Sequence, residues 1–278
     1  MKTVQSLKQC REIVATWRKE GASIGFVPTM GALHDAHLSL VRQSLRDGHK
    51  TIVSVFVNPK QFGPNEDYTT YPRVLDADAE LLRGAGVHLL FAPTVEEMYP
   101  AGFATHVHVG GLTQFLCGAT RSGHFEGVAT VVTKLLNQVQ ADAAYFGEKD
   151  WQQLQVIKRL TADLDIATRI IGVPIMREDD GLALSSRNRY LNANDRAKAP
   201  LLNITLRSLA EDILAGGDIA ALLKTAAHGL NENGFAVDYL EFADARLLSP
   251  LRNLDKSGRL FVAARIGGAR LIDNWPVN

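Results

Sequence analysis

Residues 23–37, SIGFVPTMGALHDAH, carry the clearest structural signal in this chain of 278 residues. The first seven of them are largely apolar, which is typical of a strand buried on both faces of a parallel sheet. A short loop follows, and residues 35–47 carry apolar side chains at helical spacing. The segment therefore predicts a strand, a loop and a helix in succession, which is the repeating unit of an α/β fold.

The same alternation continues to about residue 175. Further apolar runs predict buried strands at residues 51–57, 87–92, 143–147 and 168–175. Amphipathic stretches predict helices at residues 4–20, 76–85, 127–139 and 151–160. Right-handed βαβ connections place such strands in one parallel sheet with helices on both faces. We therefore predict a Rossmann-like, doubly wound parallel-sheet domain over residues 1–175.

The pattern changes beyond residue 175. Two helices are predicted there, followed by a strand and by a hairpin that turns at Gly267-Gly268. The helices cover residues 194–215 and 218–233, and the strands cover residues 237–243, 259–266 and 269–274. We predict a smaller α+β domain over residues 176–278 that covers the active site.

Composition narrows the class of protein. Lys plus Arg and Asp plus Glu number 30 each, and this balance argues against a nucleic-acid partner. No apolar run approaches the roughly 18 residues of a membrane helix, and the charged N-terminal segment predicts no signal peptide. Only Cys10 and Cys117 occur, which favours a reducing, cytoplasmic setting with both as buried small apolar residues. A soluble protein without a membrane partner is expected.

The first candidate site is the loop at residues 28–37. Open parallel sheets bind ligands at the carboxyl ends of their strands, and the N-terminus of a helix favours phosphate. His34 and His37 are three residues apart, so both imidazoles can lie on one side of the first helical turn and donate to phosphate oxygens. Ordinary surface or capping histidines, or a zinc-binding pair, are the alternatives, although no further zinc ligand is visible nearby in the sequence.

The second candidate site is FGEKDWQQ at residues 146–153, which again joins a strand to a helix at the same sheet edge. Lys149 can reach back over the strand ends and neutralise phosphate charge. Asp150 can cap the helix or accept a hydrogen bond from a ribose hydroxyl. The alternative is a helix start with a solvated Glu-Lys-Asp run.

The third candidate site is DDGLALSSRNRY at residues 179–190, just past the predicted domain boundary. Two adjacent hydroxyls and an arginine on a glycine-flanked loop can clamp a phosphate, and the loop is placed to act as a lid. A polar interdomain linker with a helix cap is the alternative. Residues 56–62, with Gln61 between apolar residues, and residues 121–127 add polar groups at two further loops.

Five segments together resemble the pantothenate synthetase (pantoate–β-alanine ligase) family, within the nucleotidylyltransferases that use HIGH-like and KMSKS-like motifs. They are FVPTMGALHDAH (26–37), SVFVNPKQFGPNEDYTTYPR (54–73), residues 121–160, VPIMREDDGLALSSRNRYL (173–191) and VAARIGGARLIDN (262–274). The spacing HxxH alone is weak evidence, but the first four of these segments, in this order and spacing, are very specific; the C-terminal segment is similar too.

The resemblance implies an AMP-forming, ATP-dependent acid–amine ligase of the coenzyme A pathway. Pantoate would attack the α-phosphorus of ATP with Mg²⁺ assistance, and β-alanine would then displace AMP from pantoyl adenylate to form pantothenate. ATP, pantoate and β-alanine are the implied small-molecule partners. The resemblance also implies a homodimer. Mg²⁺ would bridge phosphate oxygens mainly through water, so no protein metal ligand is named.

The resemblance also assigns roles to residues of this chain. The catalytic set would be His34, His37 (the proton donor), Lys149, Ser185, Ser186 and Arg187. The ATP-binding set would be Met30, Gly31, Ala32, Leu33, His34, Asp35, Ala36, His37, Gly147, Glu148, Lys149, Asp150, Met176, Leu184, Ser185, Ser186 and Arg187. Gln61 and Gln153 would hydrogen-bond pantoate, with Met30 and Phe62 as apolar walls. Within these sets, Gly147, Asp150 and Met176 would line the adenosine, and residues 185–187 would close over the β- and γ-phosphates.

Two positions depart from the family pattern. Ala36 stands where the family has glycine between the two histidines. Alanine fits a helical first turn without strain, so we predict retained activity. Ser122 replaces a proline that is frequent in the family, with a small expected effect on loop stiffness.

Two other functions compete with the ligase. A different nucleotidylyltransferase or a tRNA-charging relative would use the same motifs, but the neutral charge and the lack of an anticodon-binding extension argue against tRNA. A nucleotide sensor on the same fold is the second, because a fold alone does not establish catalysis.

Overall fold

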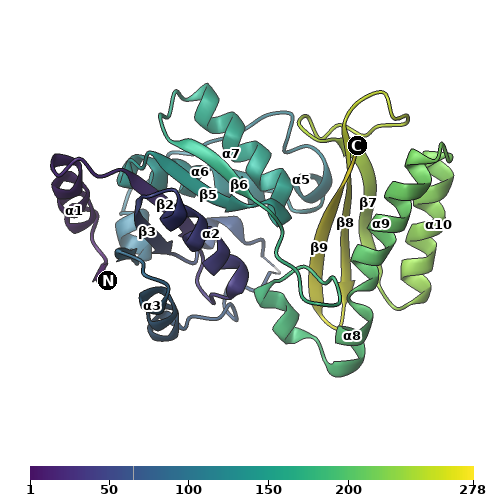
Figure 1. Ribbon diagram of the computed structural model, residues 1–278, viewed down its shortest axis with the longest axis horizontal. Coiled ribbons are helices and arrows are strands. Elements are labelled where there is room, and N and C mark those ends of the chain that lie inside the picture. Colours follow the sequence, from purple (N-terminus) through teal and green to yellow (C-terminus); the bar gives the residue numbers. More distant parts are fainter. Residues whose placement is uncertain (65) are drawn as a thin grey trace. The chain divides into compact units, whose positions relative to one another are not determined.

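The computed structural model describes residues 1–64 and 66–278 and divides into two compact units (Figure 1). Unit 1 comprises Met1–Val109, Arg121–Glu148 and Val156–Pro174. Unit 2 comprises Gly110–Thr120, Lys149–Gln155 and Ile175–Asn278. Each unit contains its own β-sheet, and the chain passes between the two units several times.

Unit 1 is built on a six-stranded parallel sheet, which confirms the predicted doubly wound α/β architecture. The strand order is β1-β4-β3-β2-β5-β6. Their bounds are β1 Lys2–Val4, β2 Ile24–Thr29, β3 Lys50–Val55, β4 Leu89–Phe91, β5 Ala143–Gly147 and β6 Arg169–Val173. The order reverses between β2 and β5, so the loops that follow these two strands diverge there. Doubly wound sheets bind their ligands at such a point.

Helices cover both faces of this sheet. Helix α2 (Asp35–Arg46) and helix α3 (Leu75–Gly84) pack on one face, where their apolar residues form a core with Val27, Val53 and Leu90. Helix α6 (His124–Val139) packs against β2, and helix α1 (Leu7–Lys19) packs on α6. Right-handed connections place α1 and α6 on the opposite face from α2. Figure 1 shows α2 and α6 on the two sides of the strands. Unit 1 also contains two short helical segments, η1 (Pro59–Gln61) and α4 (Val95–Met98).

Unit 2 contains an antiparallel sheet in the order β7-β8-β9. The strands are β7 Ala236–Asp244, β8 Gly258–Ile266 and β9 Ala269–Val277. The turn of the β8–β9 hairpin has positive φ at Gly267 (54°) and Gly268 (79°), which only glycine adopts readily. The predicted α+β character of this part of the chain is therefore confirmed.

Helices pack on the two faces of the unit 2 sheet. Helix α9 (Leu201–Leu214) and helix α10 (Ile219–Glu232) form the larger core with it. Helix α5 (Leu116–Thr120) and Trp151, at the start of helix α7 (Trp151–Asp163), form a second cluster with β7 and β8. The remaining elements are η2 (Glu148–Asp150), η3 (Ser186–Tyr190) and α8 (Ala193–Lys198).

Some predicted element boundaries were wrong. Residues 2–4 form strand β1 beside β4, so the first helix starts later, after the Ser6 cap. The predicted helix at residues 194–215 is two helices, because Pro200 lacks the N–H that a continuous helix needs. Cys10 and Cys117 are both buried, as expected. Among the described residues, no helix is long and apolar enough to cross a membrane.

Candidate active site

The loop after β2 has an unusual backbone. Gly31 has a φ of +83° and Ala32 a φ of +50°, so two successive residues occupy the left-handed region. The Thr29 side chain stabilises the turn. Its Oγ1 donates to the Ser54 carbonyl at 2.8 Å and accepts from the Gly31 N–H at 3.2 Å. A bent backbone of this kind is held by its surroundings, and it redirects the chain from β2 into α2.

Asp78 on α3 stabilises the same turn through its carboxylate. Its carboxylate accepts from the N–H of Ala32 at 2.9 Å and from the N–H of Leu33 at 2.8 Å. Asp78 is 1% exposed, and the Leu33 side chain packs into the core of the sheet. These two backbone donors therefore point into the protein and are occupied by a carboxylate. Ala32 and Leu33 contribute the shape of the loop rather than N–H donors for a phosphate.

His34 and His37 lie together at the start of α2. His34 is the N-cap residue, and its backbone N–H donates to Nδ1 of His37 at 3.3 Å. The ring centroids are 4.2 Å apart. Because Nδ1 of His37 accepts a hydrogen bond, the proton of the neutral ring is on Nε2. His37 thus has a donor on the ring nitrogen remote from its backbone contact.

The neighbours of these histidines fit an ordinary helix start. Asp35 is exposed, and Ala36 lies in the first turn of α2 without a positive φ. The expectation that alanine fits here is confirmed as a matter of backbone geometry; its effect on ATP binding stays a prediction. Within residues 1–64 and 66–278, no group of three or more His, Cys, Asp or Glu side chains is arranged to hold a metal ion.

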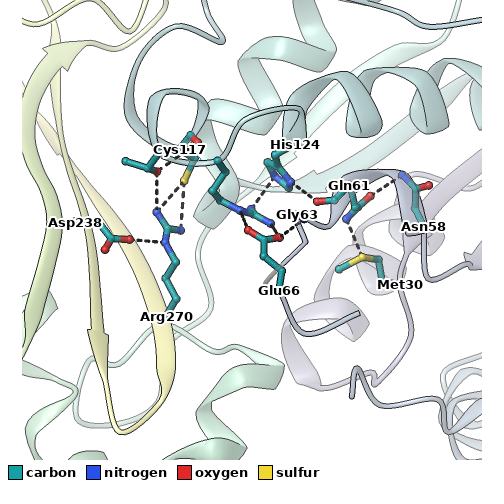
Figure 2. A network of polar contacts seen from close by, with 11 residues as sticks. Met30, Asn58, Gln61, Gly63, Glu66, Cys117, His124, Asp238 and Arg270 are labelled. Carbon is teal, nitrogen blue, oxygen red and sulfur yellow. Dashed lines mark hydrogen bonds and ion pairs between the residues drawn. The ribbon is translucent and has the colours of Figure 1, made fainter. Parts of the chain in front are cut away.

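Gln61, at the end of η1, is oriented by a buried amide that sequence reasoning missed. Asn58 is 1% exposed; its Nδ2 donates to Gln61 Oε1 and to the Gly127 carbonyl, both at 3.1 Å. Its Oδ1 accepts from the Tyr99 hydroxyl at 2.8 Å. With its oxygen taken by Asn58, Gln61 donates from Nε2 to the sulfur of Met30 at 2.8 Å (Figure 2). The structure thus brings together Gln61 and Met30, two predicted substrate-binding residues.

A chain of charged groups supports the backbone beside Gln61. Arg121 donates to both carboxylate oxygens of Glu66 at 2.6 Å and lies 2.9 Å from Nε2 of His124, whose Nδ1 donates to the Gln61 carbonyl at 2.9 Å (Figure 2). Burial opposes ionisation of Glu66, but the hydrogen bonds and charge of Arg121 outweigh it and lower the pKa to about 2. The predicted wall residue Phe62 packs against the rings of Tyr68 and Tyr71.

The end of β5 contributes two more predicted residues to unit 1. Gly147 is the last residue of β5, the strand that pairs with β2, and Glu148 follows it directly. No atom lies within 4 Å of the position that a Cβ on Gly147 would occupy. The carboxyl ends of β2 and β5 therefore present adjacent loops with open space above Gly147.

The remaining predicted residues belong to unit 2. They are Lys149, Asp150, Gln153, Met176, Leu184, Ser185, Ser186 and Arg187. Lys149 and Ser185 line one small cavity of about 10 Å³, together with Asn188 and Asp273. That volume is close to the space needed for one water molecule. Two predicted phosphate-binding residues, 36 positions apart in sequence, are thus brought together.

The segment that carries Ser185 is a short hairpin. Leu184 donates its N–H to the Met176 carbonyl at 3.0 Å, and the backbones of Arg177 and Ala183 pair in an antiparallel β-bridge. Ser185 caps η3, with its Oγ accepting from the Arg187 N–H at 3.3 Å. The cap proposed from sequence for this loop is therefore present, and it fixes the Ser185 hydroxyl against the backbone of Arg187.

The adjacent glutamines of α7 have separate environments. Gln152 is 6% exposed; its Nε2 donates to the carbonyls of Leu112 and Phe115, and its Oε1 accepts from the Cys117 N–H. Both polar atoms of its side-chain amide are therefore hydrogen-bonded to the backbone of α5 and of the segment before it. Gln153, the predicted pantoate ligand, is only partly buried.

Comparison with known proteins identifies the family. The profile described as pantoate-beta-alanine ligase matches residues 2–276. A pantothenate synthetase of Paramagnetospirillum magneticum is 56% identical over 98% of this chain and 96% of its own length. One of Pseudomonas aeruginosa (strain PAO1) is 53% identical over 100% and 99%.

Solved structures agree. The crystal structure of pantothenate synthetase from Thermus thermophilus matches with a TM-score of 0.94 and 49% identity, covering 100% of this chain and 99% of that one. A pantoate-beta-alanine ligase from Francisella tularensis, complexed with beta-gamma ATP and beta-alanine, matches with a TM-score of 0.81 and 37% identity over 99% and 97%. This chain belongs to the pantoate–β-alanine ligase family.

Proposed function

We propose that this protein condenses pantoate with β-alanine to form pantothenate, using ATP and releasing AMP and pyrophosphate. The observation that carries the proposal is the family match across residues 2–276. The arrangement of His34 and His37 at the carboxyl end of β2 supports it. The related Francisella tularensis ligase was crystallised with an ATP compound and β-alanine, two of the three substrates.

The first step forms an acyl adenylate. A carboxylate oxygen of pantoate attacks the α-phosphorus of ATP, the bond to the bridging oxygen of the β-phosphate breaks, and pyrophosphate leaves. This step requires alignment and stabilisation of negative charge more than covalent help from the protein. His37 donates from Nε2 to the phosphate oxygens, and His34 lies beside it. Lys149 and Arg187 supply fixed positive charge to the triphosphate.

The second step releases the product. The β-alanine amine attacks the acyl carbon of the adenylate, the carbon–oxygen bond to AMP breaks, and the amine gives up a proton as the amide forms. Gln61 suits the recognition of pantoate because Asn58 already occupies its oxygen, which leaves Nε2 facing Met30 as a donor beside an apolar wall. Gln153 supplies a second amide to pantoate.

ATP would bind as its Mg²⁺ complex. The predicted phosphate-binding side chains are mainly nitrogen donors (His34, His37, Lys149 and Arg187), whereas Mg²⁺ prefers oxygen ligands and retains several waters. This donor set suits a cation held by the triphosphate and by water rather than by the protein. When bound, Mg²⁺ supplies further neutralisation of phosphate charge.

The residues with proposed roles belong to both units. His34, His37 and the proposed pantoate-binding residue Gln61 belong to unit 1, and Lys149 and residues 185–187 belong to unit 2. We assign the protein to the cytoplasm and expect a homodimer, following the family resemblance and the two buried, unpaired cysteines.

Isotope exchange between pyrophosphate and ATP tests the first step directly. Exchange should require pantoate but not β-alanine, and its absence in folded protein would refute the proposal. Pantothenate formation on adding β-alanine tests the second step. Supplying other acids as acceptors distinguishes a different nucleotidylyltransferase, which would exchange with an acid other than pantoate.

Lys149→Ala separates an enzyme from a nucleotide sensor. Removing one charge that stabilises the transition state should lower kcat by about 100-fold or more, with a smaller change in ATP affinity. Lys158→Ala, at an exposed lysine on helix α7, which follows η2 directly, is the matched control and should keep wild-type turnover. Equal losses of ATP affinity and of output in Lys149→Ala would favour a sensor.

Ala36→Gly tests the departure between the histidines. Because Ala36 lies in an unstrained helical turn, the parent protein should already form pantoyl adenylate at a rate within a few-fold of the glycine variant. A parent that forms no adenylate while Ala36→Gly does would show that the methyl group obstructs the nucleotide.

A further inference from the structure

We propose that Asp273 and Asn274 on β9 are positioning residues for the proposed adenylation: together they hold Lys149 and the loop of Ser185 in register. This inference deepens the proposed function and rests on it. The two residues end the segment VAARIGGARLIDN, which no step described above uses. Both are buried, at 4% and 2% exposure.

Asn274 holds the backbone of Lys149. Its Nδ2 donates to the Lys149 carbonyl at 2.9 Å, and its Oδ1 accepts from the Arg259 guanidinium. A guanidinium only donates and a carbonyl only accepts, so the amide has one possible orientation. Arg259 is itself fixed, because its guanidinium carbon lies 3.6 Å from the centroid of the Trp151 ring. Arg259 thus fixes the Asn274 amide in the orientation that donates to Lys149.

Asp273 holds the hairpin that leads to Ser185. Its Oδ2 accepts from Arg177 at 2.7 Å, and its Oδ1 accepts from Arg177 at 2.9 Å and from the Asn274 N–H at 2.7 Å. Arg177 also donates to the Gly181 carbonyl at 3.0 Å, across the hairpin. A paired, bidentate carboxylate and guanidinium fix direction as well as distance.

The two anchors meet at the candidate phosphate residues. Successive residues of a strand point to opposite sides, so Asp273 and Asn274 reach two different segments from one rigid element. Lys149, Ser185 and Asp273 line the same small cavity. A neutral amide holds Lys149, and the charge of Asp273 is taken up by Arg177. Asn274 therefore holds Lys149 through its backbone, and this leaves the positive charge of the Lys149 ammonium group in place. Phosphate binding requires that charge.

Two substitutions at Asn274 separate the lost donor from lost volume. Asn274→Asp keeps the shape but sets an oxygen against the Lys149 carbonyl, and Asn274→Ala removes both the donor and the volume. We expect each to lower kcat for pantoate-dependent ATP–pyrophosphate exchange by about tenfold or more, with KM for pantoate changed less than about twofold. Asp238→Asn is the matched control, because Asp238 pairs with Arg270 on the same sheet. It should exchange like the wild type.

A double-mutant cycle with Lys149→Ala decides whether Asn274 acts through the lysine. If it does, Asn274→Asp in the Lys149→Ala background should change the remaining rate less than about twofold. A full tenfold loss in that background would overturn the inference, as would wild-type exchange by Asn274→Asp. Failure of both Asn274 variants to fold would assign the residue to structure alone and also overturn it. Wild-type protein without exchange would instead refute the proposed function.

Discussion

Replacing Asp78 by asparagine tests how the turn between β2 and α2 is held. The carboxylate accepts two backbone N–H groups, from Ala32 and Leu33, at 2.9 and 2.8 Å, in a site where Asp78 is 1% exposed. An asparagine has one acceptor oxygen, so it can serve only one of the two N–H groups. Its amide group then faces the other, donor against donor.

The expected cost follows from these contacts. A hydrogen bond to a charged group contributes about 1.5–3 kcal/mol, and a buried donor left without a partner costs about 1–3 kcal/mol. Relief of the buried charge offsets part of this sum. We therefore expect Asp78→Asn to lower the free energy of unfolding by about 2–4 kcal/mol. The left-handed backbone at Gly31 and Ala32 would lose its restraint, so ATP–pyrophosphate exchange should fall as well.

Urea unfolding at pH 7 measures the effect, with Asp76→Asn as the matched control. Asp76 lies in the same first turn of α3 and is exposed, so it shares the charge and the helix-dipole contribution but not the buried hydrogen bonds. The difference between the two variants isolates the contacts to the turn. If Asp78→Asn unfolds within about 0.5 kcal/mol of Asp76→Asn, the restraint that we assign to Asp78 does not exist.

Two further predictions concern the support of Gln61. Gly127→Ala would place a Cβ 2.1 Å from the Lys60 carbonyl oxygen, so η1 must shift; we expect a loss of about 1–3 kcal/mol in urea unfolding and a higher KM for pantoate. Gly84→Ala, with no atom within 4 Å of its Cβ, is the control and should leave KM unchanged; a wild-type KM in Gly127→Ala would contradict the assignment. For the Glu66–Arg121 pair, the folded-state pKa of about 2 lies below the ordinary 4.5, so its stabilisation is complete above pH 4.5 and is lost as the pH falls toward 2. The advantage of the wild type over Glu66→Gln in urea unfolding should therefore shrink across that range, and a constant advantage would show that the pair is not the cause.

Local patterns were sufficient for most elements. Strands buried on both faces are continuous apolar runs, and helices show their period, because both signals arise from neighbours a few residues apart. The Gly267-Gly268 turn was readable because its positive φ values select glycine. Strand β1 was missed because three residues next to a helix are too few to show an alternation of apolar and polar side chains. They form a strand because they pair with β4.

The overall charge balance likewise does not show where charged side chains gather in the fold. Equal numbers of acidic and basic residues argue against a polyanionic partner, but they are silent on a triphosphate, which needs only a few donors in one place. Whether Lys149 and Ser185 line one cavity depends on where β9 runs.

Sequence alone determined the architecture, the family and the identities of the predicted site residues, since these depend on local periodicity and on motif order. Only the tertiary structure disclosed Asn58, Asp78 and Asn274, which hold Gln61, the turn before His34, and Lys149. Each of the last two contacts joins residues more than forty positions apart through a buried hydrogen bond. A buried polar residue is satisfied by whatever the fold brings near it, and no spacing in the chain records that partner.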